Sequence, residues 1–134
     1  MTCRRSTSEA ETEAAGEAIA GELGGRGTVL LEGDLGSGKT VLVRGLARAL
    51  GIAPREVVSP TYTLIHEHEG SGGRLVHVDL YRLEPEEVAT LGLEELLDAS
   101  TLAAIEWAER LPGVPEGLKV TIRRIGDGAR EIIW

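Results

Sequence analysis

The sequence predicts a three-layer α/β/α fold, in which helices cover both faces of a mixed, mainly parallel sheet. Three observations support this prediction. Segments of strand and helix character alternate along most of the chain, and tight glycine-containing turns insert hairpins into this alternation. The length of 134 residues suits one sheet with its helices. We therefore expect a single domain over residues 1–134.

The first part of the chain is expected to fold as a helix, a strand and a second helix. The spacing Ser8-x-x-Glu11 is that of a capping box, which predicts a helix that ends at the next glycine pair. The aliphatic segment 28–32 predicts a strand. The periodic segment 40–50 predicts a helix that ends at Gly51. A glycine-rich loop therefore joins a strand to a helix at residues 33–39.

The rest of the chain is expected to supply two hairpins, a buried strand and two short helices. Glycine-rich turns mark the hairpins, and an uninterrupted apolar run marks the buried strand. The expected segments are an extended stretch over 57–65, a strand over 74–79, two helical pieces within 83–98 that break at Gly92, a strand over 101–106, and terminal strands over 118–125 and 129–134.

Composition restricts the classes of function. The net charge of −8 disfavours direct binding to nucleic acid, so we expect any role in nucleic-acid metabolism to be exercised through a protein partner. The single cysteine, Cys3, excludes an internal disulfide. No apolar run approaches the length of about 18 residues that a membrane span needs, and no leader segment is evident, so we expect a soluble cytoplasmic protein.

The loop over residues 33–40 reads Gly-Asp-Leu-Gly-Ser-Gly-Lys-Thr, which is the GxxxxGK[ST] pattern of a phosphate-binding loop. Its glycines let backbone N–H groups face an anion at a helix N-terminus. We expect Lys39, as an exposed cation, to reach the phosphates of ATP, and the Thr40 hydroxyl to ligate Mg²⁺. The pattern predicts a P-loop NTPase-like fold. The expected phosphate contacts are Asp34, Leu35, Gly36, Ser37, Gly38, Lys39 and Thr40.

Two acidic residues end strands that should lie near this loop. Asp79 ends the segment 74–79 and Glu106 ends the segment 101–106. Ligands of α/β sheets bind at the carboxyl ends of the strands, where an acid holds Mg²⁺ directly or through water. We expect one acid to hold the metal and the other to position or polarise the attacking water, and which acid does which stays open.

Other polar residues permit weaker hypotheses. The segment Ser59-Pro-Thr-Tyr-Thr63 has the place of a nucleotide-sensing switch loop, although a Ser/Thr-rich turn without a role fits its composition nearly as well. Arg82 could approach the phosphates, but a solvated surface arginine is favoured. A zinc site formed by His66, His68 and His77 is disfavoured, because alternating polar residues on a hairpin need no ligand to explain them.

The motifs taken together resemble the TsaE (YjeE) family of ATPases, which act in bacterial tRNA threonylcarbamoyladenosine biosynthesis. They occur in the order and at the spacing of that family and cover nearly the whole chain. The resemblance rests on the loop Gly33–Thr40, Ser59-Pro-Thr-Tyr-Thr63, His77-Val-Asp-Leu-Tyr-Arg82, Leu91-Gly-Leu-Glu-Glu95, Ile105-Glu-Trp107 and the Glu11-Thr12 pair of the first helix.

The resemblance implies a small ATPase that joins TsaB and TsaD homologues, the latter of which transfers the threonylcarbamoyl group to tRNA. It implies that Lys39 binds phosphate, that Thr40 and Glu106 hold Mg²⁺, and that Asp79 is the strand-end acid. Thr61 would belong to the switch loop, and Trp107 would lie beside the site. The residues implied as adenine-side contacts are Glu9, Thr12 and Arg130.

Two alternatives to a partner-dependent ATPase remain open. The first is a small-molecule kinase, which would need a lid and basic residues to bind an anionic acceptor. Arg82 is the one basic residue between positions 80 and 100, where acids predominate, so this alternative is disfavoured. The second is a scaffold that binds ATP and a partner without turnover. The presence of Asp79 and Glu106 favours an ATP-hydrolysing protein over such a scaffold.

Overall fold

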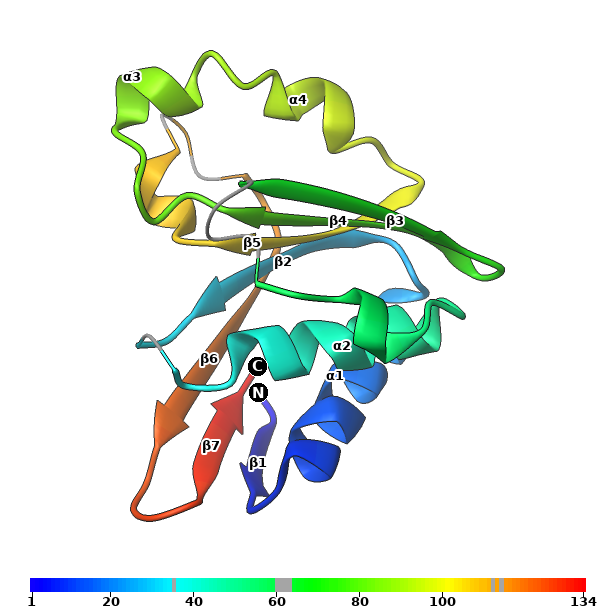
Figure 1. Cartoon of the computed structure of the whole chain (residues 1–134), viewed down its shortest axis with the longest axis vertical. Coiled ribbons are helices and arrows are strands. Elements are labelled where there is room, and N and C mark those ends of the chain that lie inside the picture. Colours follow the sequence, from blue (N-terminus) through cyan, green and yellow to red (C-terminus); the bar gives the residue numbers. More distant parts are fainter. Residues whose placement is uncertain (35, 60–63, 112, 114) are drawn as a thin grey trace.

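The computed structural model describes every residue of the chain except 35, 60–63, 112 and 114. Strands and helices alternate through most of this length, with short 3-10 helices η1 and η2 between them (Figure 1). The elements are β1 (Cys3–Ser6), α1 (Glu9–Leu23), β2 (Gly27–Glu32), α2 (Lys39–Ala49), η1 (Pro54–Glu56), β3 (Ile65–Gly70), β4 (Gly73–Asp79), α3 (Pro85–Val88), α4 (Leu93–Leu96), β5 (Thr101–Glu106), η2 (Ala108–Arg110), β6 (Leu118–Arg124) and β7 (Arg130–Ile133).

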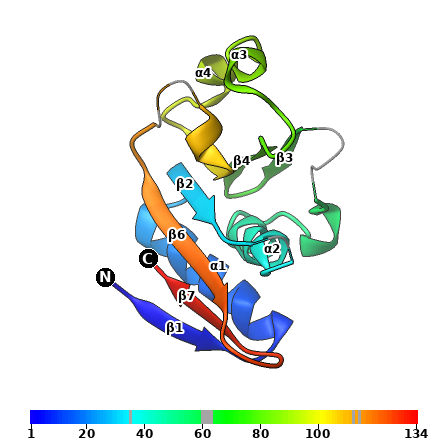
Figure 2. The same ribbon diagram turned by 90° about the vertical axis from the view of Figure 1, so that its left-hand side faces the viewer.

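The described strands form one sheet in the order β1-β7-β6-β2-β5-β4-β3. Its centre is parallel, because β2 pairs in parallel with both β5 and β6, and β5 pairs in parallel with β4. The two edges are antiparallel: β3 pairs with β4 at one side, and β7 and β1 follow β6 at the other. Figure 2 shows α3 and α4 at one end of the molecule and the β1–β7 pair at the other. The predicted mixed sheet is confirmed.

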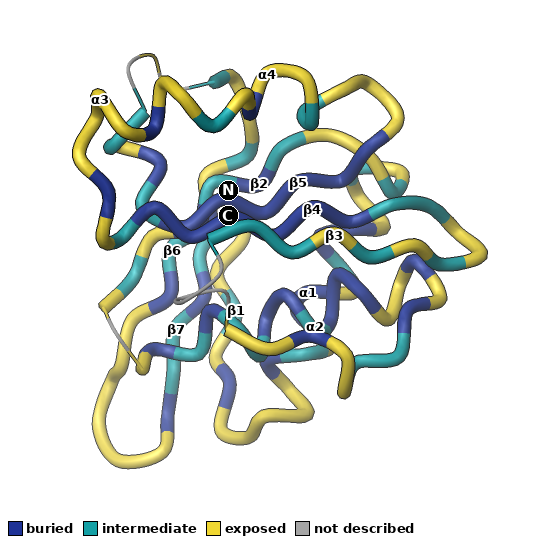
Figure 3. Tube along the Cα trace, turned by 45° about the horizontal axis from the view of Figure 1, so that its top comes forward, coloured by how far each residue is buried: buried dark blue, intermediate teal, exposed yellow. Residues whose placement is uncertain are grey.

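Helices lie on both faces of the sheet, as the fold prediction requires. α1 and α2 pack on one face and α3 and α4 lie over the other (Figure 1). Each face has its own apolar cluster, one around Leu42, Leu46 and Leu102 under α1 and α2, and one around Val78 and Ile105 under α3 and α4. All residues of β5 are buried, and the tube in Figure 3 is accordingly dark along this strand.

The N-terminal strand β1 is absent from the prediction, which began the fold with a helix. Residues Cys3–Ser6 pair antiparallel with β7, and Cys3 lies opposite Ile133. The reason is chemical: Arg4 and Arg5 give the segment no apolar run, and an edge strand needs none because only one of its sides is paired. The terminal hairpin of β6 and β7 is therefore extended by a third strand.

The two long helices approach each other closely at glycines. A Cβ atom on Gly45 of α2 would lie 2.9 Å from the Cα atom of Gly16 and closer still to the carbonyl oxygen of Glu13, both on α1. A Cβ atom on Gly16 would in turn overlap the carbonyl oxygen of Leu42. This contact fixes the relative position of α1 and α2, whose N-terminal ends both border the candidate site.

Candidate nucleotide site

The loop between β2 and α2 has the backbone that its glycines permit. Gly36 and Gly38 have φ values of 76° and 111°, in the left-handed region that side chains disfavour. A Cβ atom at Gly33 would lie 2.7 Å from the carbonyl oxygen of Ile122 on β6. Gly38 directly precedes α2, so the loop ends at the helix N-terminus, where the helix dipole favours an anion.

Lys39 lies inside this loop and is buried, with only 6% of its side chain exposed. Its Nζ donates a hydrogen bond to the carbonyl oxygen of Gly33 at 2.9 Å and lies 3.6 Å from Oε1 of Glu106. The same ammonium lies 4.9 Å from the ring centroid of Trp107. The expectation of an exposed cation is wrong, because the loop folds around the lysine and Glu106 provides a counter-charge.

Asp79 and Glu106 lie side by side at the ends of β4 and β5, where they are paired in the parallel register. Both are buried, with 4% of each residue exposed. Burial raises the pKa of Asp79, and the neighbouring Glu106 carboxylate raises it further. The Tyr81 backbone N–H donates a hydrogen bond to Oδ1 at 2.9 Å, which lowers the pKa and opposes the effect of burial. Glu106 is held by His77, whose Nε2 lies 2.6 Å from Oε2. Two carboxylates therefore converge near the loop lysine.

A pocket of about 480 Å³ opens between the loop, these acids and the start of α1. It brings together most of the residues that the sequence predicted for the site, from five different parts of the chain. Ser59, from the predicted switch segment, also borders it. The predicted residues that line the pocket are Glu9, Thr12, Gly36, Gly38, Lys39, Thr40, Asp79, Glu106 and Arg130.

Four of the predicted site residues do not line this pocket or are not among the residues that the structure describes. Asp34 does not line this pocket but borders a second one of about 350 Å³, together with Trp107 and Glu109. The Ser37 side chain is buried, and its Oγ has no hydrogen-bond partner within the described part of the chain. Leu35 and Thr61 fall outside the described residues, as do Pro60, Tyr62 and Thr63 of the predicted switch segment.

Two arginines of the terminal hairpin bind the carbonyl groups of the loop. Arg130 Nε donates to the Ser37 carbonyl oxygen at 2.8 Å, and Arg124 Nη2 donates to the Gly36 carbonyl oxygen at 2.8 Å. These hydrogen bonds connect the loop to the terminal hairpin at Gly36 and Ser37. Arg130 was expected only as an adenine-side contact, and sequence reasoning missed Arg124 because nothing in its local pattern links β6 to the loop.

Ser6 and His77 were also missed as site residues. Ser6 borders the pocket, and its Oγ lies 2.7 Å from Oγ1 of Thr12 in a buried hydrogen bond. His77 was considered only for zinc, yet its alternation with Asp79 on β4 places both on one face of the strand, which is a signal that the sequence contains. Arg82 is exposed.

The donor set fits nucleotide phosphates and Mg²⁺. Gly36 and Gly38 have left-handed backbone at the N-terminus of α2, and Nζ of Lys39 lies against the Gly33 carbonyl oxygen at the start of the same loop. Thr40, Asp79 and Glu106 offer the oxygen ligands that Mg²⁺ prefers when most of its remaining ligands are phosphates and water. Among the described residues no group of three or more His, Cys, Asp or Glu side chains could hold a metal, and this kind of Mg²⁺ site does not require one.

The fold and the loop define a protein with a P-loop NTPase-like fold. A model of the family described as threonylcarbamoyl adenosine biosynthesis protein TsaE matches residues 6–132. The chain therefore belongs to the TsaE family.

Individual relatives agree with the family match. The tRNA threonylcarbamoyladenosine biosynthesis proteins TsaE of Nostoc sp. and Bacillus subtilis are 46% and 44% identical to the chain over 108 residues, which is 77% and 78% of this chain and 66% of each relative. The chain thus spans slightly under two thirds of these relatives. The crystal structure of Bacillus subtilis YdiB superposes with a TM-score of 0.76 at 34% identity, covering 98% of this chain and 82% of that one.

Among the residues that the structure describes, no helix is both long enough and apolar enough to cross a membrane.

Proposed function

We propose that this chain is the Mg²⁺-dependent, ATP-binding and ATP-hydrolysing subunit of the cytoplasmic machinery that makes N6-threonylcarbamoyladenosine in tRNA. In this proposal it works with TsaB and TsaD homologues and meets tRNA only within their complex. Membership of the TsaE family and the names of the relatives support the pathway. The acidic net charge of −8 supports an indirect encounter with tRNA.

The observation that carries the ATPase proposal is the position of Lys39 between the loop and the two acids. Its Nζ contacts the Gly33 carbonyl oxygen and lies 3.6 Å from Glu106, whose neighbour in the sheet is Asp79. A cation, two carboxylates and a backbone cradle within one pocket supply the groups that phosphoryl transfer to water requires, namely charge neutralisation and positioning.

Each residue has a separate task in the proposed reaction. Lys39 leaves its contact with Gly33 to bind phosphate oxygens, and Thr40 together with one of the two acids would hold Mg²⁺. The acid that is not committed to the metal orients the attacking water. When bound, Mg²⁺ neutralises the charge of the β- and γ-phosphate oxygens.

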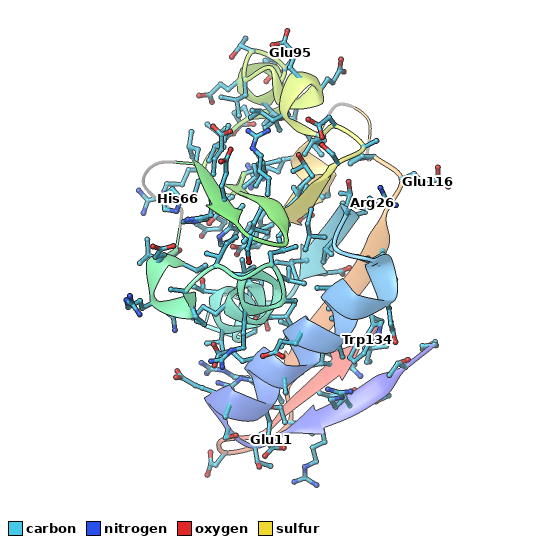
Figure 4. All side chains as sticks on the ribbon, turned by 90° about the vertical axis from the view of Figure 1, so that its right-hand side faces the viewer. Glu11, Arg26, His66, Glu95, Glu116 and Trp134 are labelled. Atoms are coloured by element: carbon cyan, nitrogen blue, oxygen red, sulfur yellow. The ribbon has the colours of Figure 1, made fainter. Side chains whose placement is uncertain are left out.

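The acidic residues of the molecule argue against the kinase alternative. Besides Asp79 and Glu106, the short helices α3 and α4 also carry acidic residues. Figure 4 shows Glu95 of α4 at the opposite end of the molecule from Glu11 of α1. A kinase for an anionic acceptor would need a basic lid over the phosphates. The α3–α4 segment is acidic instead.

Calorimetry of ATP binding to Lys39→Ala tests the nucleotide site. We expect affinity to fall by roughly 10-fold to 100-fold, which corresponds to loss of a charge-assisted hydrogen bond of about 1.5–3 kcal/mol. Lys119→Ala is the matched control, because Lys119 is an exposed lysine paired with Glu32 outside the pocket. Circular dichroism establishes that both variants are folded. Equal affinities for the two variants and the wild-type chain would contradict the proposed site.

A further inference from the structure

His77 is a fully buried imidazole beside the candidate site. It lies on β4, two residues before Asp79, with 0% of the residue exposed. Its neighbour in the register of β5 is Ala104, whose small side chain leaves room for the ring to reach diagonally toward Glu106. On the other side, His77 is paired in register with His66 of β3, which Figure 4 labels.

The ring makes one short polar contact that defines its orientation. Nε2 of His77 lies 2.6 Å from Oε2 of Glu106. Nδ1 is buried and has no hydrogen-bond partner among the residues that the structure describes. Within that part of the chain, no second hydrogen bond therefore competes with Glu106 for the ring.

The chemistry of the two groups fixes the direction of the hydrogen bond. An ionised carboxylate can only accept, so Nε2 must carry the proton that it shares with Glu106. The Lys39 ammonium lies 3.6 Å from Oε1, the other oxygen of the same carboxylate. The two carboxylate oxygens are thereby distinguished: Oε2 accepts from His77, and Oε1 faces Lys39.

We propose that His77 is a positioning residue for Glu106. By donating from Nε2 to Oε2, it holds the carboxylate in the rotamer that presents Oε1 to the loop lysine and the pocket. The inference rests on the proposed function, in which Glu106 serves the metal or the water. A histidine that orients an acidic ligand through a hydrogen bond is a known device for fixing geometry around metals, and loss of such a partner typically reduces metal affinity or activity by 10-fold to 100-fold.

Without this hydrogen bond two changes follow. Oε2 of Glu106 becomes a buried acceptor that has lost its donor, which is unfavourable for a charged group. The carboxylate is then no longer held in the rotamer that presents Oε1 to Lys39 and the pocket. Binding of nucleotide by the backbone cradle does not involve His77 and should persist.

A substitution series at His77 separates positioning from packing. Leucine removes the donor with a side chain of similar bulk, whereas glutamine returns an N–H donor near the Nε2 position. For His77→Leu we expect kcat to fall by about 10-fold to 100-fold with KM for ATP within about 3-fold of the wild-type value. His77→Gln should recover most of the lost kcat. His68→Leu on β3 is the control, since it removes a histidine from the adjacent strand without touching Glu106.

The kinetic results have clear contrary outcomes. A folded His77→Leu variant with wild-type kcat overturns the proposal, and so does a glutamine variant that is as impaired as the leucine variant. Apparent Mg²⁺ affinity, measured through Mg²⁺-dependent binding of ATP by calorimetry, should weaken for His77→Leu and remain unchanged for His68→Leu. Unchanged Mg²⁺ affinity for both variants would also overturn it.

Nitrogen NMR of the imidazole gives a readout that needs no turnover. In the wild-type chain Nε2 of His77 should be protonated with a slowly exchanging proton, and Glu106→Ala should abolish the slow exchange. An unprotonated Nε2 in the wild-type chain would overturn the inference even if ATPase activity were normal. A wild-type chain that neither binds nor hydrolyses ATP would instead refute the proposed function, while this spectrum would still decide the position of the proton.

Discussion

Substitution of Gly45 by alanine should loosen the contact between α1 and α2 that shapes the candidate site. The added Cβ would lie 2.9 Å from both the carbonyl carbon of Glu13 and the Cα atom of Gly16. All of these are backbone atoms, so no side chain can rotate away and the helices themselves must separate. The residues fully buried near this contact, among them Ile19 and Leu46, would then lose packing.

The expected cost follows from two opposing effects. Overpacking of a well-packed core typically costs about 1–3 kcal/mol and more where the backbone must move. Replacing a helical glycine by alanine returns about 1 kcal/mol of helix propensity. We expect a net loss of about 2 kcal/mol, which lowers the melting temperature by about 8 °C at roughly 4 °C per kcal/mol for a chain of this size.

Gly21→Ala is the matched control, because Gly21 lies in α1 with no atom within 4 Å of an added Cβ. It should raise the free energy of unfolding by about 0.5–1 kcal/mol. Thermal unfolding followed by circular dichroism measures both. If Gly45→Ala proves as stable as Gly21→Ala, the close approach of the two helices is not a feature of the protein in solution.

Two further predictions concern charge. Burial raises the pKa of Asp79 above its value of 3.8 in an unfolded chain, so the folded protein binds the carboxyl proton more tightly than the unfolded chain does. The neutral carboxyl therefore stabilises the fold at low pH, and this contribution is lost as pH rises through the folded-state pKa. Asp79→Asn should therefore raise the melting temperature near neutral pH and change it less near pH 4; a larger gain at pH 4 would contradict this. The isolated chain should bind tRNA no more tightly than about 10⁻⁶ M, because its net charge is −8, and tight, salt-sensitive binding in a filter assay would refute that.

The fold was predictable where local patterns are strong. Three local signals each predict a single element: the loop glycines, the apolar run of β5, and the glycine turn between β3 and β4. The structure has the element that each of these signals predicts. β1 was not predictable from its own residues, because Arg4 and Arg5 form a strand only through pairing with β7. Such pairing depends on a partner about 130 residues away in the chain, which no local pattern encodes.

The candidate site divides in the same way. Position at strand ends was enough to place Asp79 and Glu106 near the loop, since parallel neighbours end at one edge of a sheet. The burial of Lys39 and the contact of Arg124 with Gly36 are consequences of packing between segments, and the sequence contains no signal for either. His77 is intermediate, since its alternation with Asp79 was visible but its partner was not.

The central claim is that Asp79 and Glu106 serve ATP hydrolysis at the phosphate-binding loop. The most direct test is ATP binding and ATP turnover of Asp79→Ala and Glu106→Ala, measured together with the TsaB and TsaD homologues. Glu109→Ala serves as the control, because Glu109 is an exposed acid near the site that does not line the nucleotide pocket.

Turnover by the wild-type chain should be weak alone and should rise with both partners, since a small domain has little material to close over its own site. Each acid variant should bind ATP within about 5-fold of the wild-type affinity and lose about 100-fold or more in turnover, and Glu106→Ala should also fail to support tRNA modification in the reconstituted system. The control should match the wild-type chain. Acid variants that bind ATP normally and hydrolyse it at the wild-type rate would contradict the account and favour a scaffold that uses ATP without turnover.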